Sequence, residues 1–335
     1  MATRLVGVRR EVDSSRDKGA FILTGSTAPS EDAARHSGAG RFARLRMSTM
    51  TFAETKHSTA EAFFNGLLDG QDILLAAPDF SVLEVIERMT QGGWPAYLNL
   101  SNEDARESII DYAADVSAVD VRTPDRTFRD STKVSTLLRS LSRGIGTEIT
   151  VSTLAADTGL SRDTVRDYLD ALSRIFIHVE QPAWSAHLRS TATLRKAPKR
   201  HLADPALAVA LLRATPQQIL RDLGFAGQLF ESQVYHDICA LMGRGALISH
   251  ARDSVGCKVD LVVERGDGRW ALIEVKLGSS DETIEEAAAS LKRFERQLDF
   301  RGYEYPPELV VITATGPSYQ RKDGVHVVAF TALTQ

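Results

Sequence analysis

Residues 258–278 read KVDLVVERGDGRWALIEVKLG, and this stretch decides the fold of the carboxy-terminal part of the chain. An alternating run, a Gly-Asp-Gly turn at positions 266–268 and a second run predict a β-hairpin. The second run is apolar over residues 270–273 and then ends in Glu274-Val275-Lys276. A buried charge is costly unless it is paired or binds a ligand, so these charges indicate either a solvent-exposed strand end or a functional site.

The hairpin predicts where the charged side chains meet. Side chains along a strand alternate in direction, so Glu274 and Lys276 share one face. Asp260 lies near the beginning of the first strand, which the hairpin places beside the end of the second. Glu231, near the start of an amphipathic helix predicted over residues 229–242, adds a third carboxylate. We expect Asp260, Glu274 and Lys276 to be catalytic, and Glu231, Asp260 and Glu274 to bind Mg²⁺ or Mn²⁺ through their oxygens.

Asp260 followed by Glu274-Val275-Lys276 resembles the PD-(D/E)XK motif of restriction-endonuclease-like nucleases. The resemblance implies a mixed sheet that is preceded by a helix with an acidic residue. Residues 309–313 and 325–330 supply later strands, with a helix over 282–297 before them. The proline of the motif's name is absent, since Val259 precedes Asp260.

The composition is that of a globular protein of two or three domains. The 335 residues are 43% hydrophobic and 25% charged, and the net charge is −4, so any nucleic-acid-binding surface must be a local basic patch. Cys239 and Cys257 have no metal-ligand spacing and suit a reducing cytoplasm. The sequence shows no signal peptide and no run of about 18 apolar residues, so we expect a cytoplasmic location and no membrane partner.

Residues 147–184 predict a winged helix-turn-helix. A short helix is followed by a Gly159-Leu160-Ser161 turn and a second helix that carries Val165, Leu169 and Leu172 on one face. The apolar residues 175–179 suit a wing strand.

Two interpretations of this unit remain open. Arg162 and Arg166 on the second helix favour DNA contact, but three nearby aspartates favour a helical module that packs against its neighbours. The segment from Trp184 to His201 contains no acid and supplies a basic strip that could hold a nucleic-acid backbone. Its basic residues are Arg189, Arg195, Lys196, Lys199 and Arg200. The alternative is a solvated loop.

The amino-terminal third combines an apolar run with short polar segments. Residues 20–24 predict a buried parallel strand. Three segments resemble the end of a prokaryotic AAA-type ATPase domain: ILTGS, then HSGAGR at 36–41 and LRMSTMTFAE at 45–54. No phosphate-binding loop of the form G-x-x-x-x-G-K-[ST] occurs, so ATP is not expected as a cofactor, and we expect a truncated ATPase reading frame.

Helices are expected over residues 59–68, 81–89 and 101–115, with a Gly-Gly-Trp-Pro turn at 92–95. The order from Ala20 onward, including KAPKRHLADPALAVALL, resembles the bacterial and archaeal ATPases whose carboxy-terminal half is catalogued as domain of unknown function 4143.

The predicted fold is α/β and multidomain: a remnant of a P-loop ATPase domain, a winged helix-turn-helix and a restriction-endonuclease-like mixed α/β domain. The expected parts are an ATPase remnant (1–58), a helical connector (59–128), a winged helix-turn-helix (129–184), a basic linker with a helix (185–225) and a nuclease-like domain (226–335). The expected function is a Mg²⁺-dependent nuclease acting on DNA. The alternative is a non-catalytic module of an ATPase system that binds nucleic acid or protein, the protein being another partner or a second copy of this chain.

Overall fold

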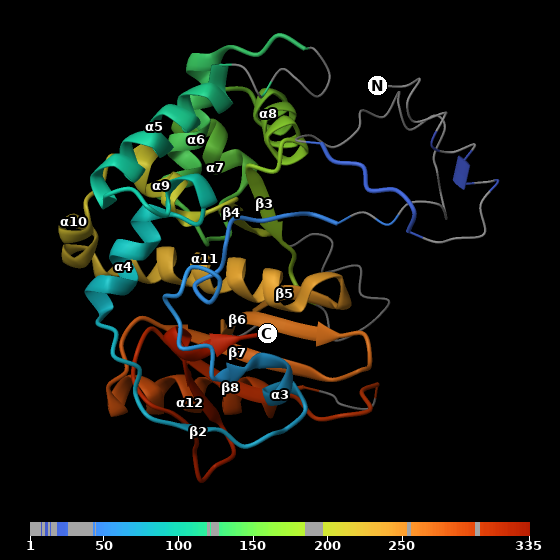
Figure 1. Ribbon diagram of the computed structural model, residues 1–335, viewed down its shortest axis with the longest axis vertical. Helices are drawn as coiled ribbons and strands as arrows, with labels where there is room; N and C mark the ends of the chain where they lie inside the picture. Colours follow the sequence, from blue (N-terminus) through green and yellow to red (C-terminus); the bar gives the residue numbers. More distant parts are fainter. Residues whose placement is uncertain are drawn as a thin grey trace.

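The computed structural model shows a mixed α/β protein (Figure 1). The structure describes residues 8, 11, 12, 14, 19–25, 43, 45–118, 121, 127–184, 197–252, 256–298 and 302–335. Within these residues, helices α3 to α12 accompany one seven-stranded mixed sheet and two smaller strand pairs. A helical part lies above α11 in Figure 1, and the sheet lies below it.

The hairpin predicted from the Gly-Asp-Gly turn is confirmed. Strand β6 (Lys258–Arg265) pairs antiparallel with β7 (Trp270–Lys276). Gly268 has a φ of 89°, a conformation that glycine adopts without the strain of a side chain. The ladder runs from Glu264↔Trp270 at the turn to Leu261↔Ile273 at the open end.

The hairpin lies within a sheet whose strand order is β2-β9-β10-β8-β7-β6-β5. Strand β8 pairs parallel with β7 and with β10, whereas the remaining pairs are antiparallel. The other strands are β2 (Leu74–Leu75), β5 (Ala246–Arg252), β8 (Glu308–Thr313), β9 (Ser318–Gln320) and β10 (His326–Ala329). The strands predicted over 309–313 and 325–330 are therefore present.

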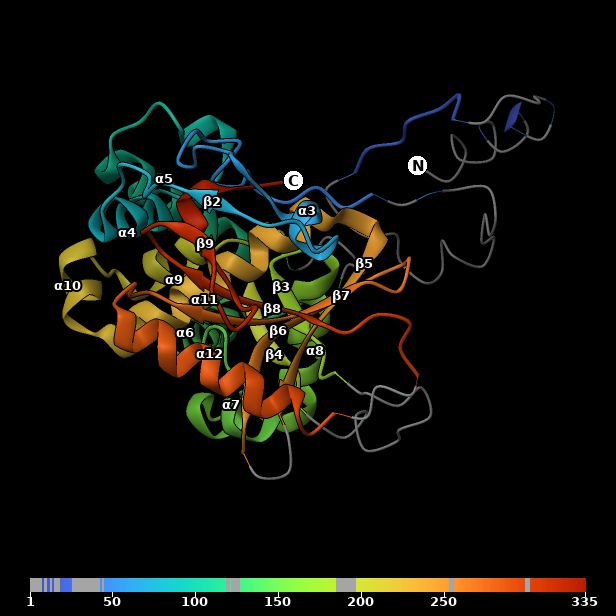
Figure 2. The same ribbon diagram turned by 90° about the horizontal axis from the view of Figure 1, so that it is seen from below.

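A helix covers each face of this sheet. α11 (Leu223–Met242) packs against one face and α12 (Asp281–Glu295) against the other, where it crosses β6 to β8 (Figures 1 and 2). The alternation along β7 explains this arrangement, because Ala271 and Ile273 join the core under α11, while Trp270 and Leu272 join the core under α12.

The helical part precedes α11 in the chain. Its helices are α4 (Val82–Gln91), α5 (Asn102–Ala118), α6 (Ser131–Arg143), α7 (Val151–Thr158), α8 (Arg162–Arg174), α9 (Pro205–Leu212) and α10 (Pro216–Arg221). Ser81 starts α4 through a reciprocal pair of hydrogen bonds with Glu84, a capping box. None of the helices among the described residues combines the length and the apolar character needed to cross a membrane.

The two helices predicted on either side of the Gly159-Leu160-Ser161 turn are present as α7 and α8. Gly159 ends α7 in the left-handed conformation, and the Ser161 side chain accepts the backbone N–H of Thr164 to begin α8. The following strand begins later than predicted: β3 spans His178–Gln181, because Phe176 has a φ of 64° and interrupts the extended chain. β3 pairs antiparallel with β4 (Lys199–Leu202), which the sequence analysis had assigned to a linker.

Two expectations for the amino-terminal third were wrong. Residues 20–24 are exposed and form no strand, because none of the strands in the described part of the chain lies beside them to bury their apolar side chains. The helix expected over residues 59–68 is reduced to α3 (Phe64–Leu68), since β1 (Ala62–Phe63) pairs with β11 (Leu333–Thr334) at the other end of the chain. β2 then adds a strand to the main sheet beside β9.

The Gly-Gly-Trp-Pro turn lies against the backbone of an earlier segment. A side chain on Gly93 would place its Cβ 2.3 Å from the carbonyl oxygen of Met50, closer than any real contact. The Gly93 N–H donates to the Asp204 carboxylate at 2.8 Å, and Asp204 also accepts the N–H of Ala206 to begin α9. The turn therefore joins α4 to α9 through one buried carboxylate.

Candidate functional site

The candidate site lies where the β6–β7 ladder ends. Asp260 and Glu274 occupy the positions that follow the last pair, Leu261↔Ile273. The backbone N–H of Val275 donates to Asp260 Oδ2 at 2.9 Å, so a side-chain carboxylate replaces the carbonyl that would continue the ladder. The predicted proximity of Asp260 to the Glu274–Lys276 end of β7 is thus observed.

Glu274 has one paired oxygen and one buried, unpaired oxygen. Lys276 Nζ donates to Glu274 Oε1 at 2.8 Å, while Oε2 is buried without a hydrogen-bond partner. Burial, followed by the charge of Asp260, raises the pKa of Glu274 to about 7 despite the neighbouring Lys276. An orphaned carboxylate oxygen in a buried position is the donor that a hard cation would satisfy.

Glu231 reaches the same cluster from α11, and its partner is a lysine that the sequence analysis assigned elsewhere. Lys199 Nζ lies 2.5 Å from Glu231 Oε1 and 3.5 Å from Asp260 Oδ1. Burial and the charge of Asp260 raise the pKa of Glu231 to about 8, although Lys199 acts in the opposite direction. Burial alone would lower the pKa of Lys199, but the charges of Glu231 and Asp260 raise it above its ordinary value.

The placement of Lys199 corrects its assignment to an exposed basic strip. Lys199 is only 7% exposed, and its β4 neighbour Arg200 is only 5% exposed. Side chains alternate along β4: Lys199 and His201 contact Glu231 and Ser232 of α11, whereas Arg200 pairs with Glu180 and donates to the Ile149 carbonyl. Strand β4 therefore connects the helical part, through β3, to α11, which packs on the main sheet. A signal was present, because β4 leads directly into the all-apolar helix α9 and had to be buried with it.

The remaining residues predicted to bind nucleic acid lie away from this cluster or outside the described residues. Arg162 and Arg166 are exposed on α8, and Arg166 pairs with Asp163 at 2.8 Å. Arg189, Arg195 and Lys196 fall outside the residues that the structure describes. The structure therefore brings together the four residues predicted for catalysis or metal binding, Glu231, Asp260, Glu274 and Lys276, and adds Lys199, which was predicted to bind nucleic acid.

The cluster suits a divalent metal in its chemistry. Three carboxylates offer hard oxygen ligands, and Glu274 Oε2 has no other partner. In the parts of the chain that are described, however, no three acidic, histidine or cysteine side chains already surround one point as a metal would require. The Lys199 ammonium lies between Glu231 and Asp260, so Asp260 and Glu274 are the residues that would hold a metal.

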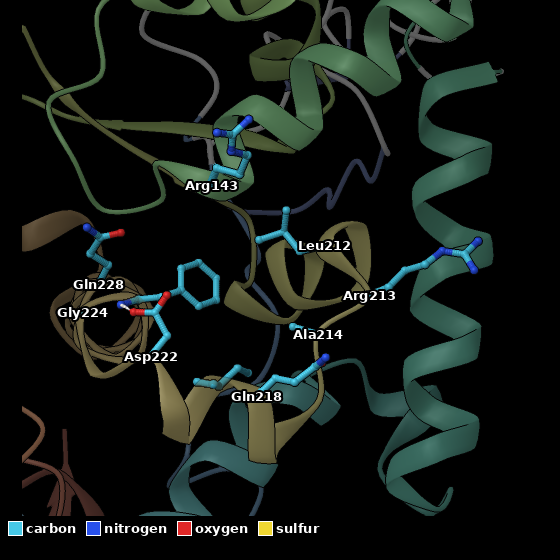
Figure 3. Close-up of a pocket in the computed structure, with 10 residues that line it drawn as sticks. Arg143, Leu212, Arg213, Ala214, Gln218, Asp222, Gly224 and Gln228 are labelled. Carbon is cyan, nitrogen blue, oxygen red and sulfur yellow. Dashed lines mark hydrogen bonds between the residues drawn. The ribbon is translucent and has the colours of Figure 1, made fainter.

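A cavity of about 630 Å³ lies elsewhere, at the junction of α9, α10 and the start of α11 (Figure 3). Arg143, Leu212, Gln218, Asp222 and Gln228 are among its lining residues. None of the five clustered side chains lines it, so this cavity is not part of the candidate site.

Comparisons with known families identify two segments. Residues 226–333 match the family DUF4143. This match, to a family described as a domain of unknown function, confirms the resemblance for the carboxy-terminal part. Residues 83–218 match a different family, also described as a domain of unknown function (DUF8612), so the DUF4143 match does not extend over the middle of the chain as the sequence analysis expected. Neither match supports the ATPase resemblance of residues 20–54.

The DUF4143 match contains Glu231, Asp260, Glu274 and Lys276, whereas Lys199 lies in the DUF8612 match. The cluster is therefore assembled from both segments. No curated protein and no solved structure matches the chain.

Proposed function

We propose that the DUF4143 domain is a metal-dependent nuclease of restriction-endonuclease-like fold that acts on DNA. The observation that carries the proposal is the convergence of Asp260, Glu274 and Lys276 at the open end of one hairpin, with a buried, unpaired oxygen on Glu274. The order of elements supports it: α11, which carries Glu231, precedes β5, β6 and β7, and α12 and β8 follow. This is the order that the resemblance to PD-(D/E)XK nucleases implies.

Each side chain has a role in this proposal. Asp260 and Glu274 would hold Mg²⁺ or Mn²⁺, which would polarise a phosphoryl oxygen of the substrate and lower the pKa of a bound water. The N–H of Val275 fixes the Asp260 carboxylate so that its second oxygen is directed away from the ladder. Lys276, now paired with Glu274, neutralises the negative charge that develops on the phosphate. Glu231 completes the acidic cluster at the helix.

DNA is proposed as the substrate because a helix-turn-helix adjoins the site. α7, α8 and the β3–β4 pair have the order of a winged helix, and β4 carries Lys199 into the cluster. Arg162 and Arg166 are exposed on α8 and would contact phosphates, Arg166 by exchanging its ion pair with Asp163 for a phosphate.

The proposal is tested by incubating the full chain with supercoiled plasmid and either Mg²⁺ or Mn²⁺. We expect nicking that is abolished by a chelator and by Asp260→Asn, Glu274→Gln and Lys276→Met. Glu286→Gln serves as the matched control, since Glu286 is an exposed carboxylate on α12 away from the cluster. Nicking that persists in Asp260→Asn and Glu274→Gln would assign the cleavage to another site or to a contaminant.

A second candidate function is a non-catalytic interaction module that binds nucleic acid or protein. It is favoured by the buried Lys199–Glu231 ion pair, which stabilises the seam between the two parts without a metal. It predicts no cleavage with either metal and no loss of DNA binding in Asp260→Asn.

A further inference from the structure

We propose that the Lys199 ammonium is an internal cation that competes with the divalent metal for Asp260, so that metal binding requires Lys199 to withdraw from that carboxylate. The inference rests on the proposed function and adds a regulatory residue from the neighbouring segment to its metal site. It concerns Lys199 itself and not the identity of the metal ligands.

The two carboxylate oxygens of Asp260 have different partners. One carboxylate oxygen, Oδ2, accepts the Val275 N–H at 2.9 Å, and the other, Oδ1, faces Lys199 Nζ at 3.5 Å. Oδ2 belongs to the end of the ladder, where the geometry is fixed by the backbone. Oδ1 is therefore the oxygen that a metal would use, and a positively charged group already lies against it.

The charges of the cluster limit how much further positive charge it can accept. Three carboxylates, of Glu231, Asp260 and Glu274, face the two ammonium groups of Lys199 and Lys276. With all three carboxyl groups ionised, one positive charge more would balance the cluster, whereas a divalent cation beside both ammonium groups brings an excess of positive charge into a buried region. Like charges in such a region repel strongly, so the metal and the Lys199 ammonium cannot both lie against Asp260 at low cost.

The unequal distances show how the exchange would take place. Lys199 is closer to Glu231, at 2.5 Å, than to Asp260, at 3.5 Å. It can keep its pair with Glu231 while it leaves Asp260. The backbone of β4 need not move, because Arg200 anchors it to Glu180 and His201 anchors it to Ser232 on either side of the strand.

This arrangement makes the DUF8612 segment a regulator of the site in the DUF4143 domain. Lys199 and Asp260 are 61 residues apart in the chain.

The test is Mn²⁺ binding to the metal-free full chain, measured by calorimetry and by the loss of the free-ion electron paramagnetic resonance signal. Lys199→Met, which keeps the length of the side chain without its charge, should bind Mn²⁺ at least about tenfold more tightly than wild type. Lys199→Met leaves the Glu231 carboxylate buried without its partner, so this variant could fail to fold. A second comparison therefore also removes the charge of Glu231. The double variant Lys199→Met/Glu231→Gln should bind Mn²⁺ at least about tenfold more tightly than Glu231→Gln alone.

The outcomes separate this inference from the proposed function. Equal or weaker binding in the variants that lack Lys199, with clear binding in wild type, overturns the competition and leaves the metal site in place. No binding in wild type, in Lys199→Met or in the double variant overturns the metal site itself. Tighter binding that survives Glu274→Gln in the double-variant background places the metal outside the cluster and rejects the inference.

Discussion

Asp260 and Glu274 occupy the first positions beyond the hydrogen-bonded ladder of the β6–β7 hairpin, one on each strand. The Asp260 carboxylate accepts the N–H of Val275. A side-chain oxygen thus takes the place of the backbone carbonyl that a continued ladder would have paired with this N–H. Glu274 is held beside it with a raised pKa and a buried, unpaired oxygen. The strand ends in Glu-Val-Lys because its charged side chains form a cluster with partners from α11 and β4.

The first prediction concerns pH. Burial and Asp260 raise the pKa of Glu274 from 4.5 to about 7. The stability that this carboxyl contributes is complete below its unfolded pKa and is lost as the pH rises through about 7. In the presence of a chelator, the free energy of unfolding of wild type should therefore fall between about pH 5 and pH 8 by on the order of 2 kcal/mol relative to Glu274→Gln. Urea denaturation across this range measures it.

Glu286→Gln is the control for this series and should follow the wild-type curve, since its carboxylate is exposed. Parallel curves for wild type and Glu274→Gln would mean that Glu274 ionises normally, which contradicts its burial beside Asp260.

The second prediction uses two glycines in opposite environments. Gly93→Ala should destabilise the protein by roughly 2–4 kcal/mol, because the new Cβ would lie 2.3 Å from the Met50 carbonyl and force the turn away from Asp204. Gly227→Ala should instead be neutral or stabilising by up to about 1 kcal/mol, because Gly227 lies within α11 with open space around it. Denaturant midpoints measure both. A Gly93→Ala midpoint equal to that of wild type would show that the turn is not held against Met50.

The third prediction concerns nucleic acid. If α8 contacts DNA, Arg162→Gln with Arg166→Gln should weaken binding and reduce the slope of log affinity against log salt by up to about 2. Fluorescence anisotropy with a labelled duplex at several salt concentrations gives both values. Arg293→Gln, an exposed charge on α12, should leave them unchanged. Unaltered binding in the double variant would favour the interpretation of α7 and α8 as a packing module.

Local patterns in the sequence were enough to predict the hairpin and the proximity of Asp260 to Glu274. The Asp-Gly turn sets the strand pairing, and strand alternation then places each side chain. The same reasoning failed for Phe21, Ile22 and Leu23, because an apolar run forms a buried strand only where other strands lie beside it, and these residues are exposed.

Lys199 and β2 show a second limit. Lys199 was grouped with its basic neighbours, but its partner Glu231 is 32 residues further along the chain. β2 is two leucines long and is defined by its pairing with β9, more than 240 residues away. Contacts of this range leave no periodic signal in the sequence.

A thermal melt of the full chain with and without millimolar Mn²⁺ is the most direct test of a metal site at Asp260 and Glu274. Preferential binding to the folded state predicts that Mn²⁺ raises the wild-type melting temperature by a few degrees. It should raise the melting temperature of the Glu286→Gln control equally, and that of Asp260→Asn and Glu274→Gln hardly at all. A metal site at Asp260 and Glu274 would be contradicted if Mn²⁺ left the melting temperatures of both wild type and Lys199→Met unchanged. It would also be contradicted if Mn²⁺ stabilised wild type and Asp260→Asn equally.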